Sequence, residues 1–402
     1  MSVSGGRVVV VGASLAGVRV VKALRRRGFD GELVLVGEEG ELPYDRPPLS
    51  KGFLSSQGPV AVRQLEPESF YEGVEVRLGA RASGLSLRER SVLLADGSRV
   101  RADHVVVTTG ARARSLPGFA DGDRVARLRT ADDARRIRSA LTEARHVLVL
   151  GAGFIGCEVA AAARRRGVDV TVVEPAPTPV QRGVGALVGG TIAALHRDRG
   201  VDLRLGVSVE CGQEHSGGVI VSLTDGTLIE TDFVVLGVGA APNTEWLKES
   251  GLDVSNGLLC DDRCRAVGGG GHVWAAGDVA AWPSGRTGER VRIEHWTNAV
   301  EQAGVLAVNL LDDGTEVTHD PVPYVWSDQY EHKIQILGRV SGDDDTTLLR
   351  GSLDERQFSL AYSRHGRIRG LVAFDLPREI AARRPLVAAG APLAGVLDGR
   401  HG

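Results

Sequence analysis

The sequence predicts an α/β protein with two parallel-sheet domains of one design and a third, C-terminal domain with an antiparallel sheet. Two observations predict the repeated design: an apolar run, a glycine-rich turn and a helix follow one another at residues 7–37, and again at 146–174. The third observation is the alternation of apolar residues from 322 to 338, which is typical of antiparallel strands. A chain of 402 residues is long enough for two or three domains with substantial cores.

Composition narrows the classes of function. The net charge is −3, from 48 basic and 51 acidic side chains, so we expect no nucleic acid as general partner. The longest apolar runs have the length of strands, so we expect no membrane span, and no separate apolar segment indicates a secretory signal. The four cysteines form no Cys-x-x-Cys pair and the histidines show no ligand spacing, which favours the cytoplasm and no metal site.

Residues 7–37 predict a strand, a tight turn, a helix and a second, parallel strand. Gly12 permits the turn, Gly17 permits close packing of helix on strand, and Ser14 stands where the usual pattern has a middle glycine. The helix N-terminus offers free N–H groups to a pyrophosphate, and Glu38, about 20 residues beyond Gly17, can accept a hydrogen bond from a ribose hydroxyl. We therefore predict a dinucleotide site here.

Residues 146–174 repeat every part of this pattern, with glycine at all three positions, Gly151, Gly153 and Gly156. Because the match is complete, it predicts a second working site rather than a decayed duplicate. Glu174 ends the second strand, where a carboxylate binds the free ribose hydroxyls of NAD and repels the 2′-phosphate of NADP. Two Rossmann-like dinucleotide-binding domains, one for FAD and one for NADH, predict hydride transfer from nicotinamide to flavin.

Seven further motifs occur in order along nearly the whole chain: PYDRPPLSK (43–51), TTGARARSLPG (108–118), LRTADDA (128–134), GVGAAPN (237–243), WAAGDVA (274–280), RIEHWTNAVEQA (292–303) and VWSDQYEHKIQILG (325–338). Together they resemble the NADH-dependent ferredoxin reductases of bacterial oxygenase systems, of the putidaredoxin and rhodocoxin reductase type. The resemblance implies electron transfer from NADH through FAD to a small [2Fe–2S] or other iron–sulfur ferredoxin. That ferredoxin would supply an oxygenase such as a haem monooxygenase.

The resemblance also implies FAD contacts. Asp278 would lie against the ribityl chain, Arg129 would meet the pyrophosphate, and the helix beginning at Trp296 would face the flavin pyrimidine edge. The residues alone also allow Asp278 to cap a helix and Thr297 to cap an ordinary amphipathic helix. The full set of expected FAD contacts is Gly12, Ser14, Leu15, Ala16, Gly17, Glu38, Arg46, Lys51, Ala82, Thr109, Gly110, Arg129, Gly277, Asp278, Glu294, His295 and Trp296.

Three residues are the catalytic candidates. By resemblance, Lys51 approaches the reacting edge of the flavin and pairs with Glu158, which positions the nicotinamide, and Trp326 lies beside the flavin near the docked ferredoxin. The alternatives are a solvated lysine, an exposed helical glutamate and a core tryptophan. The expected NAD contacts are Gly151, Gly153, Phe154, Ile155, Gly156, Glu158, Glu174 and Gly239. Candidate docking residues for an acidic ferredoxin are Arg63, Arg378, Arg383 and Arg384.

We predict a discontinuous FAD-binding domain at residues 1–113 and 243–320, an NAD-binding domain at 114–242 and a C-terminal interface domain at 321–402. One alternative function is an NADH-dependent disulfide or peroxide reductase, which needs a reactive cysteine near the flavin. The loop after Glu38 has none, and Cys157, in the helix of the NAD site, is expected to be a buried small hydrophobe. The other alternative is a non-enzymatic protein that senses flavin and NADH.

Overall fold

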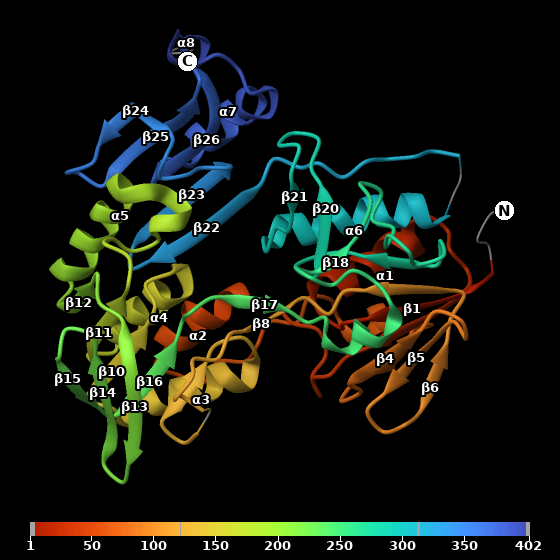
Figure 1. The fold of residues 1–402 in the computed structure, drawn as a ribbon, viewed down its shortest axis with the longest axis horizontal. Helices are drawn as coiled ribbons and strands as arrows, with labels where there is room; N and C mark the ends of the chain where they lie inside the picture. The colour runs from red at the N-terminus through yellow and green to blue at the C-terminus, as the bar shows by residue number, and fades with distance from the viewer. Residues whose placement is uncertain (1–4, 121, 312–313, 399–402) are drawn as a thin grey trace. The chain divides into compact units, whose positions relative to one another are not determined.

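A computed structural model describes residues 5–120, 122–311 and 314–398 (Figure 1). The chain forms two compact units. The first unit contains residues 1–45, 63–112 and 241–321, and the second contains 46–62, 113–240 and 322–402. Within the described ranges, no helix has both the length and the apolar character needed to cross a bilayer.

The first unit is built on a five-stranded parallel sheet. Its strands run in the order β19 (Val273–Ala275), β7 (His104–Val107), β1 (Arg7–Val11), β2 (Glu32–Val36) and β3 (Glu75–Arg77). Val8, Val9, Val10 and Val11 are at most 2% exposed, because both faces of the sheet are covered. This explains why the strand reads as a continuous apolar run rather than as an alternation.

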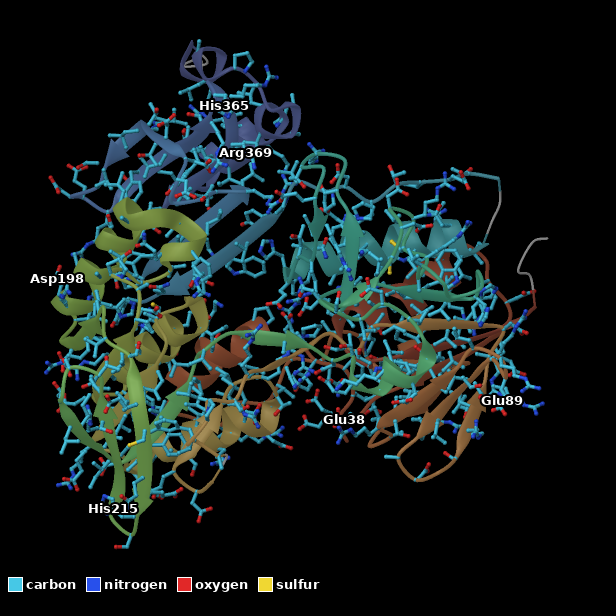
Figure 2. The ribbon with its side chains drawn as sticks, in the orientation of Figure 1. Glu38, Glu89, Asp198, His215, His365 and Arg369 are labelled. Atoms are coloured by element: carbon cyan, nitrogen blue, oxygen red, sulfur yellow. The ribbon has the colours of Figure 1, made fainter. Side chains whose placement is uncertain are left out.

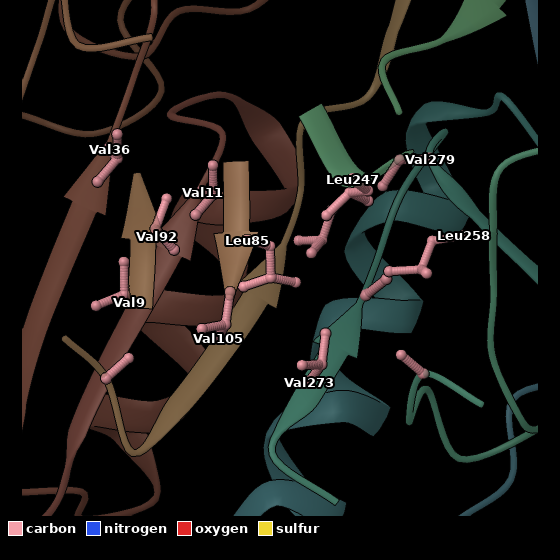
Figure 3. Close-up of a cluster of buried hydrophobic side chains, with 14 of the residues drawn as sticks. Val9, Val11, Val36, Leu85, Val92, Val105, Leu247, Leu258, Val273 and Val279 are labelled. Carbon is pink, nitrogen blue, oxygen red and sulfur yellow. The ribbon is translucent and has the colours of Figure 1, made fainter. Parts of the chain in front are cut away.

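The two faces of this sheet belong to two separate hydrophobic cores. Val8 and Val10 pack with α1 (Leu15–Arg26) and α6 (Trp296–Leu311). Val9 and Val11 pack on the other face, against the antiparallel strands β4 (Ala82–Ser86), β5 (Ser91–Leu94) and β6 (Arg99–Arg101) and against Leu258 and Val279 (Figure 3). The remaining short elements of this unit are η2 (Glu68–Tyr71), η3 (Glu245–Ser250), β18 (Leu258–Leu259), β20 (Ala280–Pro283) and β21 (Arg290–Val291).

The second unit contains a parallel sheet of the same kind. Its strands run in the order β12 (Val201–Leu205), β11 (Asp169–Glu174), β10 (His146–Leu150), β16 (Phe233–Leu236) and β9 (Val125–Arg127). Three helices accompany it, α3 (Ala131–Glu143), α4 (Phe154–Arg165) and α5 (Gln181–Asp198). An antiparallel group follows, with β13 (Val209–His215), β14 (Gly218–Leu223) and β15 (Leu228–Thr231).

The C-terminal part of the second unit is an antiparallel sheet. Its order is β22 (Tyr324–Gln329), β23 (His332–Gly338), β26 (Arg367–Phe374), β25 (Gln357–Arg364) and β24 (Asp345–Ser352), and α7 (Pro377–Ala389) and α8 (Leu393–Asp398) follow it. The prediction of two Rossmann-like parallel sheets and an antiparallel C-terminal sheet is therefore confirmed.

One segment of the second unit is short but positions the site. η1 (Pro47–Ser50) and α2 (Gly52–Ser55) pack against α3 and α4. The predicted domain division had given these residues to the FAD-binding domain; that three-domain division stays a prediction. Two other short strands, β8 (Ala111–Ala113) and β17 (Ala240–Pro242), lie where the chain passes between the units.

Candidate functional site

The first glycine turn, between β1 and α1, contains two glycines that no other residue could replace without displacing neighbouring backbone atoms. Gly12 has φ +123°, and a Cβ there would lie 2.2 Å from the Thr108 carbonyl oxygen. A Cβ at Gly17 would lie 2.2 Å from the Gly12 carbonyl oxygen. Ser14 is the N-cap residue of α1, so the first N–H groups of the helix follow it directly.

The second turn, between β10 and α4, has two closely packed glycine positions and one open position. A Cβ at Gly156 would lie 2.0 Å from the Gly151 carbonyl oxygen, and one at Gly151 would lie 2.5 Å from that of Gly237. At Gly153, by contrast, the nearest atom would be 3.9 Å away. The fold therefore does not need glycine at the middle position, and the space in front of it suits the close approach of a pyrophosphate. The same reasoning explains why Ser14 is accommodated in the first turn.

The two predicted ribose-binding acids have different surroundings. Glu174 Oε2 accepts a hydrogen bond from the Ala152 N–H at 2.8 Å, and its Oε1 accepts one from the Ala176 N–H at 2.9 Å. Its carboxylate is thus fixed beside the second glycine turn. Glu38 is 67% exposed and lies 3.6 Å from the Arg81 guanidinium (Figure 2).

Several predicted FAD contacts of the first unit lie together. A Cβ at Gly277, which has φ +82°, would lie 2.9 Å from Ala16 Cβ, so the WAAGDVA motif adjoins the first turn of α1. The Arg292 guanidinium donates to the Asp278 carbonyl oxygen at 2.9 Å. No helix begins at Asp278, because β20 follows, so its alternative role as a helix cap is wrong.

The start of α6 also has the chemistry of a ligand site. Trp296 Nε1 donates to Asp45 Oδ1 at 3.1 Å. The neighbouring His295 is half-buried, and desolvation of its ring lowers its pKa to about 4, so the ring is neutral near pH 7. Its Nδ1 has no hydrogen-bond partner among the described residues. A buried ring nitrogen without a partner fits a site completed by a bound molecule such as FAD.

The other predicted FAD contacts are distributed as follows. Thr109 and Gly110 follow β7, and the Thr109 hydroxyl donates to the Asn243 carbonyl oxygen at 2.8 Å. Ala82 begins β4, and Glu294 lies 2.5 Å from Arg292. Three of the predicted contacts belong to the second unit, namely Arg46, Lys51 and Arg129, of which Arg46 donates to the Arg129 carbonyl oxygen at 2.6 Å.

Glu158, on the second turn of α4, is the centre of a buried polar cluster. Its side chain is 2% exposed, and Lys51 Nζ lies 2.9 Å from Glu158 Oε2. The Ser50 hydroxyl donates to the same oxygen, and the Ser327 hydroxyl donates to Oε1 at 2.6 Å. A carboxylate this deeply buried requires both a counter-ion and hydrogen-bond donors, and it has them. The alternative of an exposed helical glutamate is wrong.

Sequence reasoning missed the second layer of this cluster. Gln329 Nε2 donates to Ser327 Oγ at 3.2 Å, His196 Nε2 lies 3.0 Å from Gln329 Oε1, and the Tyr330 hydroxyl lies 3.3 Å from His196 Nδ1. A signal was present: Ser327 and Gln329 alternate along one strand, so they share a face, and both are polar where a buried face is usually apolar.

The predicted NAD contacts other than Glu158 surround the second turn. Phe154 begins α4, and Ile155 beside it is 45% exposed. Gly239, with φ +97°, follows β16 and accepts the Arg114 N–H at its carbonyl oxygen. These residues and Glu174 all belong to the parallel sheet of the second unit and its connections.

Trp326 lies on the edge strand β22 and is half-buried, so it is not a core tryptophan. Its ring stacks on that of Tyr324, with centroids 6.1 Å apart. Of the candidate docking arginines, Arg63 and Arg378 are exposed, whereas Arg383 is 13% exposed and lies 2.6 Å from the buried Glu379. Arg383 is therefore a structural ion-pair partner and not a docking residue.

Three of the four cysteines are unsuited to redox chemistry, and the fourth, Cys211 on β13, is exposed. Cys157, Cys260 and Cys264 are buried, and burial raises the pKa of each thiol far above its ordinary value. Such thiols are poor nucleophiles at neutral pH. Within the ranges that the structure describes, no three metal-ligating side chains come together.

Two family models match this chain. The one described as pyridine nucleotide-disulphide oxidoreductase matches residues 6–303, and the one described as reductase C-terminal matches residues 324–396. The first match spans both glycine turns and the α6 motif. The second begins at β22, the strand that carries Trp326 and Ser327.

Curated relatives match over nearly the full chain. The anthranilate 1,2-dioxygenase system ferredoxin–NAD(+) reductase component of Burkholderia cepacia is 38% identical over 387 residues, covering 95% of this chain and 94% of that protein. Rhodocoxin reductase of Rhodococcus erythropolis is 37% identical over 390 residues, covering 96% and 90%. The crystal structure of the covalent putidaredoxin reductase–putidaredoxin complex superimposes with a TM-score of 0.92 at 31% identity, covering 99% of this chain and 96% of that one.

Proposed function

The chain belongs to the pyridine nucleotide-disulphide oxidoreductase family, and we propose how its residues carry out the reaction of an NADH:ferredoxin oxidoreductase. Electrons pass from NADH through FAD to an iron–sulfur ferredoxin that supplies an oxygenase. The relatives named as reductases of this kind cover 95% and 96% of the chain, and the reductase C-terminal model matches its C-terminal sheet. Three of the four free cysteines are buried, which favours this function over a disulfide or peroxide reductase, and the free state of all four supports a cytoplasmic location.

FAD, when bound, would supply two-electron chemistry toward NADH and one-electron chemistry toward an acceptor. The residues of this chain supply binding and orientation. The turn from Gly12 to Gly17 would hold the FAD pyrophosphate, and the turn from Gly151 to Gly156 would hold that of NADH. Glu174, already fixed by two backbone N–H groups, would bind the ribose hydroxyls and disfavour a 2′-phosphate.

The observation that carries the proposal is the pairing of Lys51 with Glu158. Glu158 lies two residues beyond Gly156, so a dinucleotide bound at the second turn places its nicotinamide end within reach of this part of α4. We assign Glu158 to hold the nicotinamide in the orientation for hydride transfer, and Lys51 to balance its charge and face the flavin. Such transfer depends on a fixed approach of donor to acceptor and needs no proton relay.

Replacement of Lys51 tests this assignment. The Lys51→Ala variant should retain FAD and yet reduce it with NADH at least about tenfold more slowly in stopped-flow absorbance, because Glu158 loses its counter-ion. Lys333→Ala is the matched control, since Lys333 is an exposed lysine of the same unit that pairs with Asp328 at 2.5 Å. Wild-type reduction kinetics in Lys51→Ala would contradict the assignment.

Trp326, half-buried on β22, is proposed to lie at the point where electrons leave toward the ferredoxin. Its exposed part makes it available to a partner, and its ring is fixed by the stacked Tyr324. Arg63, Arg378 and Arg384 remain the proposed positive residues of the docking surface. Trp326→Ala should slow ferredoxin reduction while leaving reduction of the flavin by NADH unchanged, which separate stopped-flow experiments measure.

A further inference from the structure

Four side chains in the Glu158 cluster have no part in the function proposed above. Ser327 and Gln329 are 0% exposed, His196 is 1% exposed and Tyr330 is 6% exposed. They come from β22, from the turn after it and from the last turns of α5. Burying four polar side chains in one place costs stability unless every one of them is hydrogen-bonded. Here each of them is bonded to the next, and the series ends at Glu158.

The direction of each hydrogen bond follows from Glu158. An ionised carboxylate only accepts, so the Ser327 hydroxyl donates to it, and Ser327 Oγ then accepts from the Gln329 amide. This leaves Gln329 Oε1 to accept the proton on His196 Nε2, and His196 Nδ1 to accept the Tyr330 hydroxyl. Burial lowers the pKa of His196 to about 4, which agrees with a neutral ring carrying one N–H. All donors therefore point toward Glu158.

The two oxygens of Glu158 are not held equally. Oε2 has both Lys51 and Ser50, whereas Ser327 is the donor that the structure gives to Oε1. A carboxylate rotates readily about its last torsion, so the orientation of the Oε1 side depends on Ser327. Ser327 is in turn held by Gln329, of the C-terminal sheet, and Gln329 is held by His196, of α5.

We propose that Ser327, Gln329 and His196 are positioning residues for NADH oxidation, which orient Glu158 toward the nicotinamide. The inference rests on the role assigned to Glu158 above. It gives the C-terminal sheet a task in nicotinamide binding, in addition to its place in ferredoxin reduction. The effect should concern the nicotinamide end of the ligand alone, because the pyrophosphate and ribose are held by the glycine turn and Glu174.

The test is calorimetric titration of the FAD-loaded oxidised protein with two ligands, NAD⁺ and ADP-ribose. ADP-ribose fills the same dinucleotide site but lacks the nicotinamide ring. Ser327→Ala should weaken NAD⁺ binding by about tenfold, because a carboxylate that is free to rotate must be ordered when the nicotinamide binds, and leave ADP-ribose binding unchanged. Gln329→Met should also weaken NAD⁺ binding, by a smaller factor. Because it changes a different residue, it keeps the inference testable if the first variant fails to fold.

The chain offers a matched control. Ser359, on β25, is also 0% exposed and donates to a buried glutamate, Glu379, at 3.0 Å. Ser359→Ala should therefore cause a similar loss of stability without changing the ratio of NAD⁺ to ADP-ribose affinity.

Glu158→Gln distinguishes the role assigned to Glu158 from the positioning role inferred for Ser327. If this variant leaves the affinity ratio unchanged, the role assigned to Glu158 is wrong, and the inference is overturned with it. If Glu158→Gln changes the ratio and Ser327→Ala does not, the inference alone is overturned. Equal weakening of both ligands by Ser327→Ala, or the same ratio as in Ser359→Ala, would show a structural role and also overturn it.

Discussion

His196 shows how a single buried residue makes the stability of this protein depend on pH. Its ordinary pKa of 6.5 falls to about 4 in the folded chain because burial disfavours the charged ring. The unfolded state therefore binds a proton more readily than the folded state between these two values. The destabilising effect of His196 on the folded chain is absent above pH 6.5, grows as the pH falls toward 4, and is constant below pH 4.

Between pH 7.5 and pH 5 this one residue should lower the free energy of unfolding by about 2 kcal/mol. The His196→Gln variant should lose less stability over that interval by about this amount, as measured by urea unfolding at the two pH values. The free energy of unfolding of the wild type should fall by more than the contribution of His196, since desolvation also lowers the pKa of His295 and His319 to about 4. An identical pH dependence in variant and wild type would contradict the shift.

Sequence reasoning at the residue scale found the ion pair of the Glu158 cluster and missed the side chains that hold it. Lys51 ends the PYDRPPLSK motif, and Glu158 follows the second glycine turn. Ser50, Ser327 and His196 make their contacts over separations of more than one hundred residues, and no local pattern records such a distance. Ser327 and Gln329 lie within the 325–338 motif, where their polar alternation indicates a shared face.

At the scale of elements, the glycines of one strand–turn–helix motif are expected to differ in role. Some are needed for the fold, and the open middle position is proposed to serve ligand binding. Gly153→Val should cost about 1 kcal/mol of stability, the penalty of a poor N-cap, because a Cβ there meets no close neighbour. It should nevertheless weaken NADH binding at least about tenfold by filling the space for the pyrophosphate. Fluorescence titration with NADH and urea unfolding measure the two effects.

Gly156→Ala is the matched variant, since its Cβ would lie 2.0 Å from a backbone oxygen. The free energy of unfolding of this variant should be about 3 kcal/mol lower, at the upper end of the range for overpacking substitutions. NADH affinity retained in Gly153→Val would show that the open position does not face the ligand.

The elements that could be predicted are those with a strong local pattern. β1 and β10 are continuous apolar runs before glycine turns, and the sequence identifies both. The hairpin strands β13 to β15 and the long helix α5 were not anticipated. α5 contains a break at Gly185, with φ +74° and ψ −179°, and three further glycines, so its sequence lacks the regular pattern of a helix.

At the scale of the whole molecule, the chain assembles its sites from distant segments. Each of the two compact units contains three separate stretches of chain, while the three-domain division stays a prediction. The placement of residues 46–62 with α3 and α4 follows from no local pattern, because it rests on contacts across about one hundred residues. That placement brings Lys51 to Glu158, a pair that the family resemblance implied and that the residues alone did not decide.

The measurement that tests the account most directly is an NADH titration of the FAD-loaded protein followed by oxidised [2Fe–2S] ferredoxins, with cytochrome c as the final acceptor. The account predicts that NADH bleaches the flavin absorbance and that cytochrome c reduction depends on the ferredoxin and saturates with it. Electrons delivered only to disulfides or peroxide would contradict the ferredoxin reductase assignment. A long-lived complex of NADH with the flavin, without turnover, would instead indicate a redox sensor and contradict it equally.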